Sequence, residues 1–167
     1  MIKLRNLDLK DKSQIANLLN NKNIWDNLRN VVPYPYNQND AEDFIKYVRK
    51  DKAQHIFAID YNNTFCGVIG LILQHDVYEK SAEVGYWLGE PFWNKGIMSK
   101  ALELITEYGF NELKLVRIYT GVFEYNIASM KVLEKNGYLE EGIFKKAIFK
   151  NGKMWDEHRY YKLNAKI

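Results

Sequence analysis

The stretch that decides the fold reads Ala82-Glu83-Val84-Gly85-Tyr86-Trp87-Leu88-Gly89-Glu90-Pro91-Phe92-Trp93-Asn94-Lys95-Gly96-Ile97-Met98-Ser99. Its pattern predicts a strand over residues 82–88, a loop over 89–96 and a long amphipathic helix that begins at Ile97. The first backbone N–H groups of such a helix have no intrahelical partners and lie at the positive end of the helix dipole. Gly96 lets a ligand approach the backbone, Lys95 adds charge and Ser99 adds a hydroxyl donor. The stretch therefore predicts a cradle for a pyrophosphate, or an ordinary connection whose glycine only relieves a turn.

The charge balance narrows the class of ligand. The chain has 167 residues and a formal net charge of +3, from 24 Lys and Arg against 21 Asp and Glu. The basic residues are dispersed, so a nucleic-acid partner is not expected, whereas a polyanionic cofactor suits a mild positive bias. Neither a Walker loop nor a Gly-x-Gly-x-x-Gly turn is present in the sequence.

The cysteine, the histidines and the lengths of the apolar runs limit which covalent links, metal sites and membrane segments are expected. Cys66 is the only cysteine, so no intramolecular disulfide can form, and its apolar surroundings predict an inert core residue. The three histidines are scattered without metal-ligand spacing, so no metal site is expected. No run approaches the ~20 apolar residues of a membrane span, and the N-terminus lacks the apolar core of a signal peptide. A cytoplasmic protein without a membrane partner is the resulting expectation.

Outward from the deciding stretch, the N-terminal part predicts helices between strands. Residues 2–7 form a strand, and Asp8 or Asp11 caps a helix that runs through residue 20. A second short helix covers 24–28, the Pro33-Tyr34-Pro35-Tyr36 segment breaks it, and Asp40 caps a third. Strands over 55–61 and 65–73 make a hairpin around Asn62-Asn63.

The C-terminal part alternates more regularly. The pattern predicts helices over 97–113 and 126–135, a strand over 116–122, and a closing hairpin of strands 138–149 and 154–163 around Asn151-Gly152. Gly137 is a typical helix stop. No linker or internal repeat is visible, so one domain over residues 1–167 is expected. The fold class is a mixed α/β (α+β) architecture, with a mostly antiparallel sheet of about seven strands flanked by helices.

Four motifs in register resemble the GNAT superfamily, the acetyl-CoA-dependent N-acetyltransferases. Residues Trp93-Asn94-Lys95-Gly96-Ile97-Met98 are similar to its Gln/Arg-x-x-Gly-x-Gly/Ala motif, with Trp93 and Met98 as departures. Residues 126–129, Asn-Ile-Ala-Ser, with Gly137-Tyr138, resemble the branch that acetylates protein N-termini, the RimJ/RimL type. Segments 33–45 and 151–156 add two weaker echoes, so that the resemblance spans nearly the whole chain.

The resemblance implies a GNAT-like sheet that splays open between strands 82–88 and 116–122, with the pantetheine arm of acetyl-CoA in the gap. Pantetheine would bond to the backbone of Trp87, Leu88 and Gly89 and touch Asn126, and an N–H near Leu88 would polarise the thioester carbonyl. The pyrophosphate would lie on the loop and first helical turn, which comprise Asn94, Lys95, Gly96, Ile97, Met98 and Ser99.

The resemblance also supplies candidate catalytic residues. Glu83 is the candidate base, acting on the amine through a water, although a solvent-facing strand residue is the competing interpretation. Ser129 is the candidate donor to the departing thiolate, and capping of the helix by Asn126 and Ser129 is the plainer explanation. Many relatives use a tyrosine where this chain has Leu133. A carboxylate of some N-terminal acetyltransferases is Ile148 here, which puts a protein N-terminus as acceptor in doubt.

The acceptor side is the least determined. Trp25, Tyr34 and Tyr36 either line a substrate pocket or pack in the core. Ribosomal-protein N-termini, polyamines, aminoglycosides and amino acids all stay open as amine substrates, and a homodimer is compatible with the resemblance alone. The departures from the motifs motivate an alternative function, a catalytically inactive acyl-CoA-binding or sensing module. A nucleic-acid-binding domain is a third hypothesis, motivated only by the basic pI.

Overall fold

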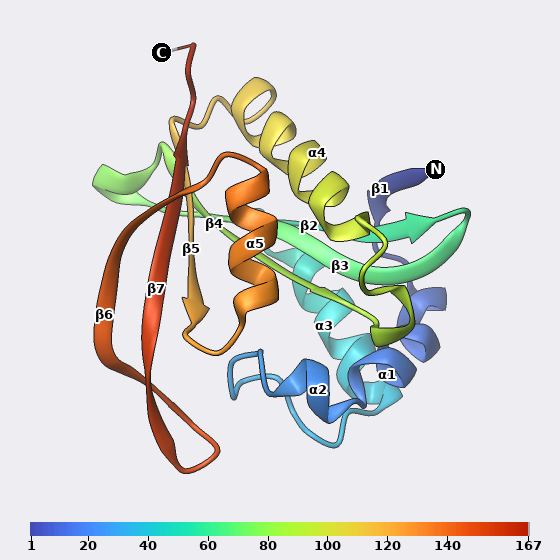
Figure 1. Ribbon diagram of the computed structural model, residues 1–167. Helices are drawn as coiled ribbons and strands as arrows, with labels where there is room; N and C mark the ends of the chain where they lie inside the picture. The colour runs from blue at the N-terminus through green and yellow to red at the C-terminus, as the bar shows by residue number, and fades with distance from the viewer. Residues whose placement is uncertain (167) are drawn as a thin grey trace.

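The computed structural model describes residues 1–166 and contains one mixed sheet with helices on both faces (Figure 1). Within that range the strand order is β1-β2-β3-β4-β5-β7-β6, and the β4–β5 pair is parallel whereas the other pairs are antiparallel. The predicted fold class is confirmed. The elements in chain order are β1 (Ile2–Asn6), α1 (Lys12–Leu19), α2 (Lys22–Trp25), α3 (Gln38–Lys50), β2 (Gln54–Tyr61), β3 (Thr64–Leu73), β4 (Ser81–Leu88), α4 (Ile97–Asn111), β5 (Arg117–Phe123), α5 (Ile127–Lys135), β6 (Leu139–Lys150) and β7 (Lys153–Leu163), with short 3-10 turns at Leu9–Asp11, Asp76–Tyr78 and Glu90–Phe92.

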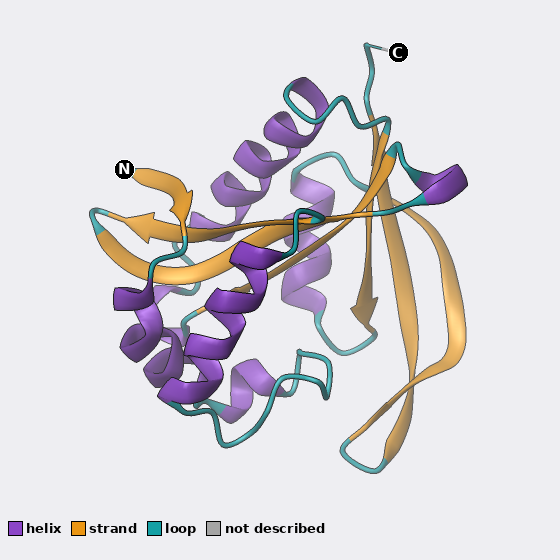
Figure 2. Ribbon diagram, turned by 180° about the vertical axis from the view of Figure 1, so that it is seen from behind, coloured by secondary structure: helices purple, strands orange, loops and turns teal. Residues whose placement is uncertain are grey.

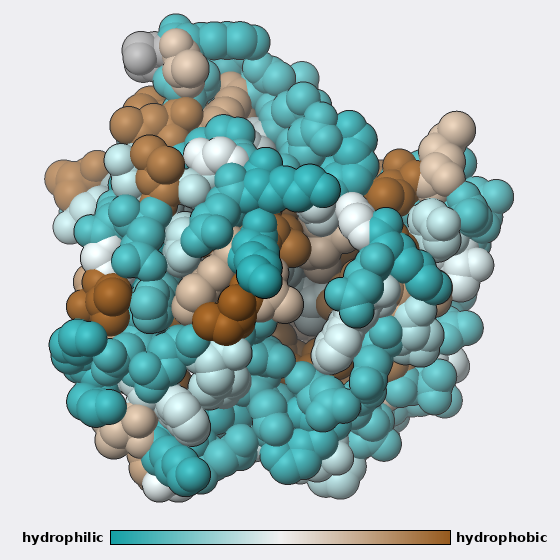
Figure 3. All heavy atoms as spheres, viewed as in Figure 1, coloured by the Kyte–Doolittle hydropathy of each residue, from teal (hydrophilic) through white to brown (hydrophobic). Residues whose placement is uncertain are grey.

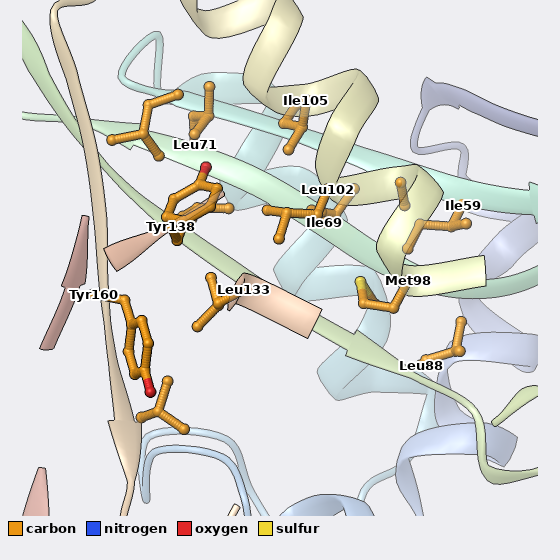
Figure 4. Packing of buried hydrophobic residues seen from close by; sticks show 14 of the residues in the cluster. Ile59, Ile69, Leu71, Leu88, Met98, Leu102, Ile105, Leu133, Tyr138 and Tyr160 are labelled. Atoms are coloured by element: carbon orange, nitrogen blue, oxygen red, sulfur yellow. The ribbon is translucent and has the colours of Figure 1, made fainter. Parts of the chain in front are cut away.

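The sheet separates two hydrophobic core layers, one beneath the helices on each face. Helices α4 and α5 cover one face of the sheet, and α1 to α3 lie on the other face (Figures 1 and 2). On the first face, Leu102 and Ile105 of α4 are fully buried and pack against β3 (Figure 4). On the second face, Ile15 of α1 and Ile45 of α3 are buried against β2 and β3. Alternate residues of one strand therefore belong to different cores.

The sheet opens between its two central strands. The parallel pairing of β4 with β5 covers only Ser81↔Arg117, Ala82↔Ile118 and Glu83↔Tyr119. Beyond that point β4 continues to Leu88 and stays paired with β3, while β5 continues to Phe123 and stays paired with β7. The two strands thus diverge with one backbone edge each facing the gap. The predicted splay is confirmed.

Local signals explain most of the boundaries. Asn62-Asn63 and Asn151-Gly152 all have positive φ, as two-residue hairpin turns require. Helix α3 shows one error of prediction, because its N-cap is Asn37 and not Asp40. The Asn37 side chain accepts from the Asp40 N–H (3.0 Å), and the Asp40 carboxylate accepts from the Asn37 N–H (2.8 Å). Asp40 is therefore the second half of a capping box.

Cys66 lies in the core as predicted. It is fully buried, its thiol donates to the Ile59 carbonyl (3.2 Å), and burial raises its pKa to about 12. The thiol therefore stays protonated and unreactive. Among residues 1–166, no helix combines the length and the apolar character that crossing a membrane requires.

Candidate active site

The edge of β4 at the gap carries free backbone groups. The Gly89 N–H donates to the Cys66 carbonyl (2.8 Å), on the side of β3. Because neighbouring residues of a strand direct their N–H and C=O groups to opposite sides, those of Leu88 face the gap. The Leu88 carbonyl accepts from the Trp93 indole N–H (2.8 Å), so Trp93, a departure from the family motif, braces this edge. The Leu88 N–H faces the gap, whereas the N–H of Gly89 is engaged within the sheet.

The N-terminus of α4 has uncapped backbone N–H groups and free space in front of them, as an anion-binding site requires. Gly96 has φ 72° and precedes the helix, no side chain caps the helix, and a Cβ on Gly96 would meet nothing within 4 Å. The Lys100 N–H makes the first intrahelical bond, to the Gly96 carbonyl, which leaves the earlier N–H groups without helical partners. Asn136 donates to the Ser99 hydroxyl oxygen (3.0 Å), so the Ser99 proton stays free to donate to a ligand.

One continuous cavity of about 1610 Å³ joins this helix start to the gap and to the α2–α3 side of the sheet. Figure 3 shows a hollow on this face, with apolar atoms on its floor and hydrophilic atoms around its rim. Its lining segregates charge. The loop before α4 and helix α5 contribute Lys95, Lys131 and Lys135, and the rest of the lining contributes Asp26, Asp40, Asp43, Glu83 and Glu157 with Arg29. The lysine end suits a polyanion and the carboxylate end suits a cation.

Two hydroxyl groups meet on the α5 side of the gap. The Ser129 and Tyr86 hydroxyl oxygens lie 2.7 Å apart, and the Ser129 N–H donates to the Asn126 side chain (3.3 Å). Asn126 therefore caps α5 and lines the cavity. Burial raises the pKa of Tyr86 to about 12, so its hydroxyl stays neutral and can donate. Tyr86 was not among the predicted site residues, although strand alternation from Glu83 places it on the face opposite to that carboxylate.

Glu83 lies at the apex of the gap, as the last β4 residue paired with β5. Its carboxylate forms an ion pair with Arg29, whose side chain is 64% exposed against 19% for Glu83. Burial, and then the charge of Glu83, raise the pKa of the neighbouring Tyr119. Arg29 comes from the loop after α2, far away in sequence, and no local pattern could have indicated it.

A second carboxylate, Glu157 of β7, also lines the cavity. It is only 8% exposed, and Arg159 donates to it through Nε (2.5 Å). A Cβ on Gly121 would lie 2.5 Å from the carboxyl carbon of Glu157, so the missing side chain of Gly121 makes the space for this carboxylate. Sequence reasoning missed Glu157, because only the β5–β7 pairing brings it to the gap.

The aromatic residues expected at the acceptor pocket divide into two groups. Tyr36 is buried and lines the cavity, but Trp25 and Tyr34 are absent from the lining. Their ring centroids are 5.4 Å apart, and the Trp25 indole N–H donates to the Val32 carbonyl (2.8 Å). Lys150 places its Nζ 3.2 Å from the Trp25 ring centroid. Trp25 and Tyr34 therefore brace the loop after α2 from behind and do not line the pocket.

Two further departures from the family pattern, Leu133 and Ile148, lie away from the cavity lining. Leu133 is fully buried in the core beneath α5, and Ile148 of β6 pairs with Trp155 away from the cavity. Within residues 1–166 no group of three or more potential ligands could hold a metal ion. The polar groups that line the cavity are backbone groups, hydroxyls, lysines and carboxylates.

The comparisons with known proteins agree with this geometry. Residues 2–139 match the family model "Acetyltransferase (GNAT) domain". The chain is 31% identical over 158 residues to the uncharacterized N-acetyltransferase YnaD of Bacillus subtilis (strain 168), covering 94% of this chain and 90% of that protein. It is 45% identical over 80 residues to the probable N-acetyltransferase YjcK of the same organism, covering 48% of this chain and 44% of that protein.

Two solved structures show the same fold with coenzyme A. Spermidine N-acetyltransferase from Vibrio cholerae, in complex with CoA and spermine, has a TM-score of 0.85 at 28% identity and covers 99% of this chain and 96% of that chain. The ribosomal L7/L12 α-N-protein acetyltransferase RimL, in complex with coenzyme A, has a TM-score of 0.85 at 26% identity, with 97% and 93% covered. The chain belongs to the GNAT acetyltransferase family. It is accordingly an acyltransferase that uses acetyl-CoA.

Proposed function

We propose that this chain acts as a single domain over residues 1–167 and transfers the acetyl group of acetyl-CoA to a primary amine in a ternary complex. The acceptor is a small cationic amine or a peptide N-terminus, and the chain belongs to the RimJ/RimL-like branch of its family. The observation that carries the proposal is the single cavity. It runs from the open start of α4, through the β4–β5 gap, to a wall of carboxylates.

In this proposal the lysine end of the cavity binds the coenzyme. The pyrophosphate accepts hydrogen bonds from the first-turn N–H groups of α4, with Lys95 and Ser99 beside it. The pantetheine arm lies along the free edge of β4 and passes Asn126. The Leu88 carbonyl already accepts from Trp93, and the Leu88 N–H is left for the thioester carbonyl at the end of this arm.

The chemistry follows from groups that already face the gap. The neutral amine attacks the thioester carbonyl, the new C–N bond forms and the C–S bond breaks. The Leu88 N–H stabilises the oxyanion. Glu83 takes a proton from the bound ammonium through a water, once the acceptor displaces Arg29 from its carboxylate, and this leaves the neutral amine that attacks. As the C–S bond breaks, the remaining proton of the attacking nitrogen passes to the departing thiolate through the Ser129 hydroxyl, which accepts one proton as it gives one, and Tyr86, held neutral by burial, holds that hydroxyl in place.

Charge at the acceptor end supports a cationic acceptor. Five carboxylates and one arginine line that part of the cavity, and the guanidinium of Arg29 already occupies the side chain of Glu83. A relative of the same fold is named for spermidine and another for a ribosomal protein N-terminus, both of them amines. Both acceptor kinds present a protonated nitrogen near neutral pH.

Free-thiol release from acetyl-CoA tests the proposal, with a panel of N-terminal peptides, polyamines, aminoglycosides and amino acids. We expect turnover on at least one amine, and a loss of about 100-fold or more in Glu83→Gln and in Ser129→Ala at unchanged CoA affinity. Glu140→Gln is the matched control, since Glu140 pairs with His158 on the closing hairpin and does not line the cavity. Tight CoA binding without turnover on any amine would instead indicate an inactive acyl-CoA-binding or sensing module.

A further inference from the structure

Glu157 lies on the β5 side of the gap, opposite to β4. Tyr119 is the last β5 residue that pairs with β4, and Gly121 follows two residues later, about 7 Å along the strand. Residues two apart on a strand share a face, so Gly121 lies on the face to which Glu83 and Tyr119 project. The Glu157 carboxylate lies directly over Gly121. Two carboxylates therefore face the acceptor side, one at the apex of the gap and one along its β5 wall.

The carboxylate of Glu157 has one oxygen engaged. Arg159 donates from Nε to Oε1 (2.5 Å), and among residues 1–166 no hydrogen bond reaches Oε2. The side chain is 11% exposed and lines the cavity, so its free oxygen has access to that space. Arg159 itself is fixed beside the strand, with its guanidinium carbon 4.7 Å from the ring centroid of Phe144. A preorganised acceptor oxygen faces the site where a cationic substrate has to lie.

We propose that Glu157 binds the attacking nitrogen of the acceptor, with Oε2 accepting a hydrogen bond from the ammonium or amine. The inference rests on the proposed function. The two carboxylates then have separate roles. Glu157 holds the nitrogen beside the thioester, and Glu83 at the apex of the gap receives its proton. Gly121 is the positioning residue, because only a residue without a side chain leaves room for this carboxylate.

Steady-state kinetics with acetyl-CoA and each of two probes, spermidine and tetraalanine amide, test the assignment. Glu157→Gln keeps the shape of the side chain and removes its charge. A hydrogen bond to a charged partner contributes a factor of about 10 to 150, so we expect the KM for the amine to rise about 10- to 100-fold. The KM for acetyl-CoA stays within about twofold, because the coenzyme lies at the other end of the cavity. Glu140→Gln leaves both constants unchanged.

Gly121→Ala gives a test that leaves the charge in place. Its Cβ would lie 2.5 Å from the Glu157 carboxyl carbon and has to displace it, so we expect the same rise in amine KM. The double variant Gly121→Ala with Glu157→Asp has a shorter side chain that draws the carboxylate back from the new methyl group. We expect it to recover at least about threefold of the loss in amine KM, whereas a melting temperature that recovers without any recovery of the amine KM would show a merely structural role.

The outcomes separate this inference from the proposed function. If wild type turns over either probe but Glu157→Gln keeps its amine KM within about twofold, the inference is overturned and the proposed function stands. A rise in both KM values together with a lowered melting temperature would show that Glu157 is only a structural partner of Arg159, which also overturns it. If wild type acetylates neither probe nor any amine of the wider panel, the proposed function fails and the inference falls with it.

Discussion

Replacement of Lys150 by methionine tests how the loop after α2 is held on the closing hairpin. Lys150 is 1% exposed, and its Nζ donates to the Leu28 carbonyl (2.9 Å) and to the Asn30 side chain (3.0 Å) over the ring of Trp25. Each hydrogen bond from a charged donor contributes about 1.5–3 kcal/mol. The release of the charge from a buried site offsets part of that loss, as the lowered pKa of Lys150, caused by burial, indicates.

We therefore expect Lys150→Met to reduce the free energy of unfolding by about 3 kcal/mol, since methionine keeps the aliphatic stem but leaves the Leu28 carbonyl without a donor. For a chain of this size that corresponds to a melting temperature lower by about 6–12 °C. Urea unfolding followed by circular dichroism measures the change. Lys153→Met, an exposed position of the same hairpin, is the control. A loss below about 1 kcal/mol in Lys150→Met would refute the idea that Lys150 fastens this loop.

Three further predictions concern the coenzyme site, alkaline pH and the thiol. Gly96→Ala forces a methyl group into a left-handed conformation at a cost of about 1–2 kcal/mol, and weaker CoA binding by calorimetry, without a clash, is the expected result. Burial raises the pKa of Tyr36, Tyr86 and Tyr125 to about 12, so above pH 10 the unfolded state binds fewer protons than the native state. The free energy of unfolding should thus fall from pH 10 to pH 12, and a flat urea series across that range would contradict this. Cys66 should react with a thiol reagent only at the rate of unfolding, and a fast native reaction would show that the core opens locally.

Short-range sequence signals predicted most of the fold. Alternation in β4, the helical stripe of α4 and the Asn-Gly turn of the closing hairpin are local properties, and each of them gave the correct element. The sheet opening came from resemblance and not from periodicity. The error at α3 has a local cause: Asn37 and Asp40 are both good capping residues, and only the reciprocal pair of hydrogen bonds shows which one begins the helix.

The lining of the cavity was predictable from the sequence at the start of α4 and much less so on the α2–α3 side of the sheet. Lys95 and Gly96 lie in one continuous segment, so the sequence order itself places them at a helix start. Arg29 and Glu157 meet the cavity through packing of elements that are distant in the chain, and no spacing rule links them. The same limitation explains Trp25 and Tyr34, whose aromatic character fitted a pocket and equally fitted the braced loop behind it.

The divergence of β4 and β5 affects how stable the protein is against proteolysis in the cell. Three residue pairs join the two halves of the sheet, and the edge beyond them has backbone groups that no strand satisfies. In the binding mode proposed above, the amides of the coenzyme arm form hydrogen bonds at this edge and connect the two strands. A ligand present at about 100 times its Kd stabilises its protein by about 2.7 kcal/mol. We therefore expect a low acetyl-CoA concentration to speed the proteolysis of this chain in the cell. The acetyl-CoA concentration would then set the amount of the enzyme as well as its rate.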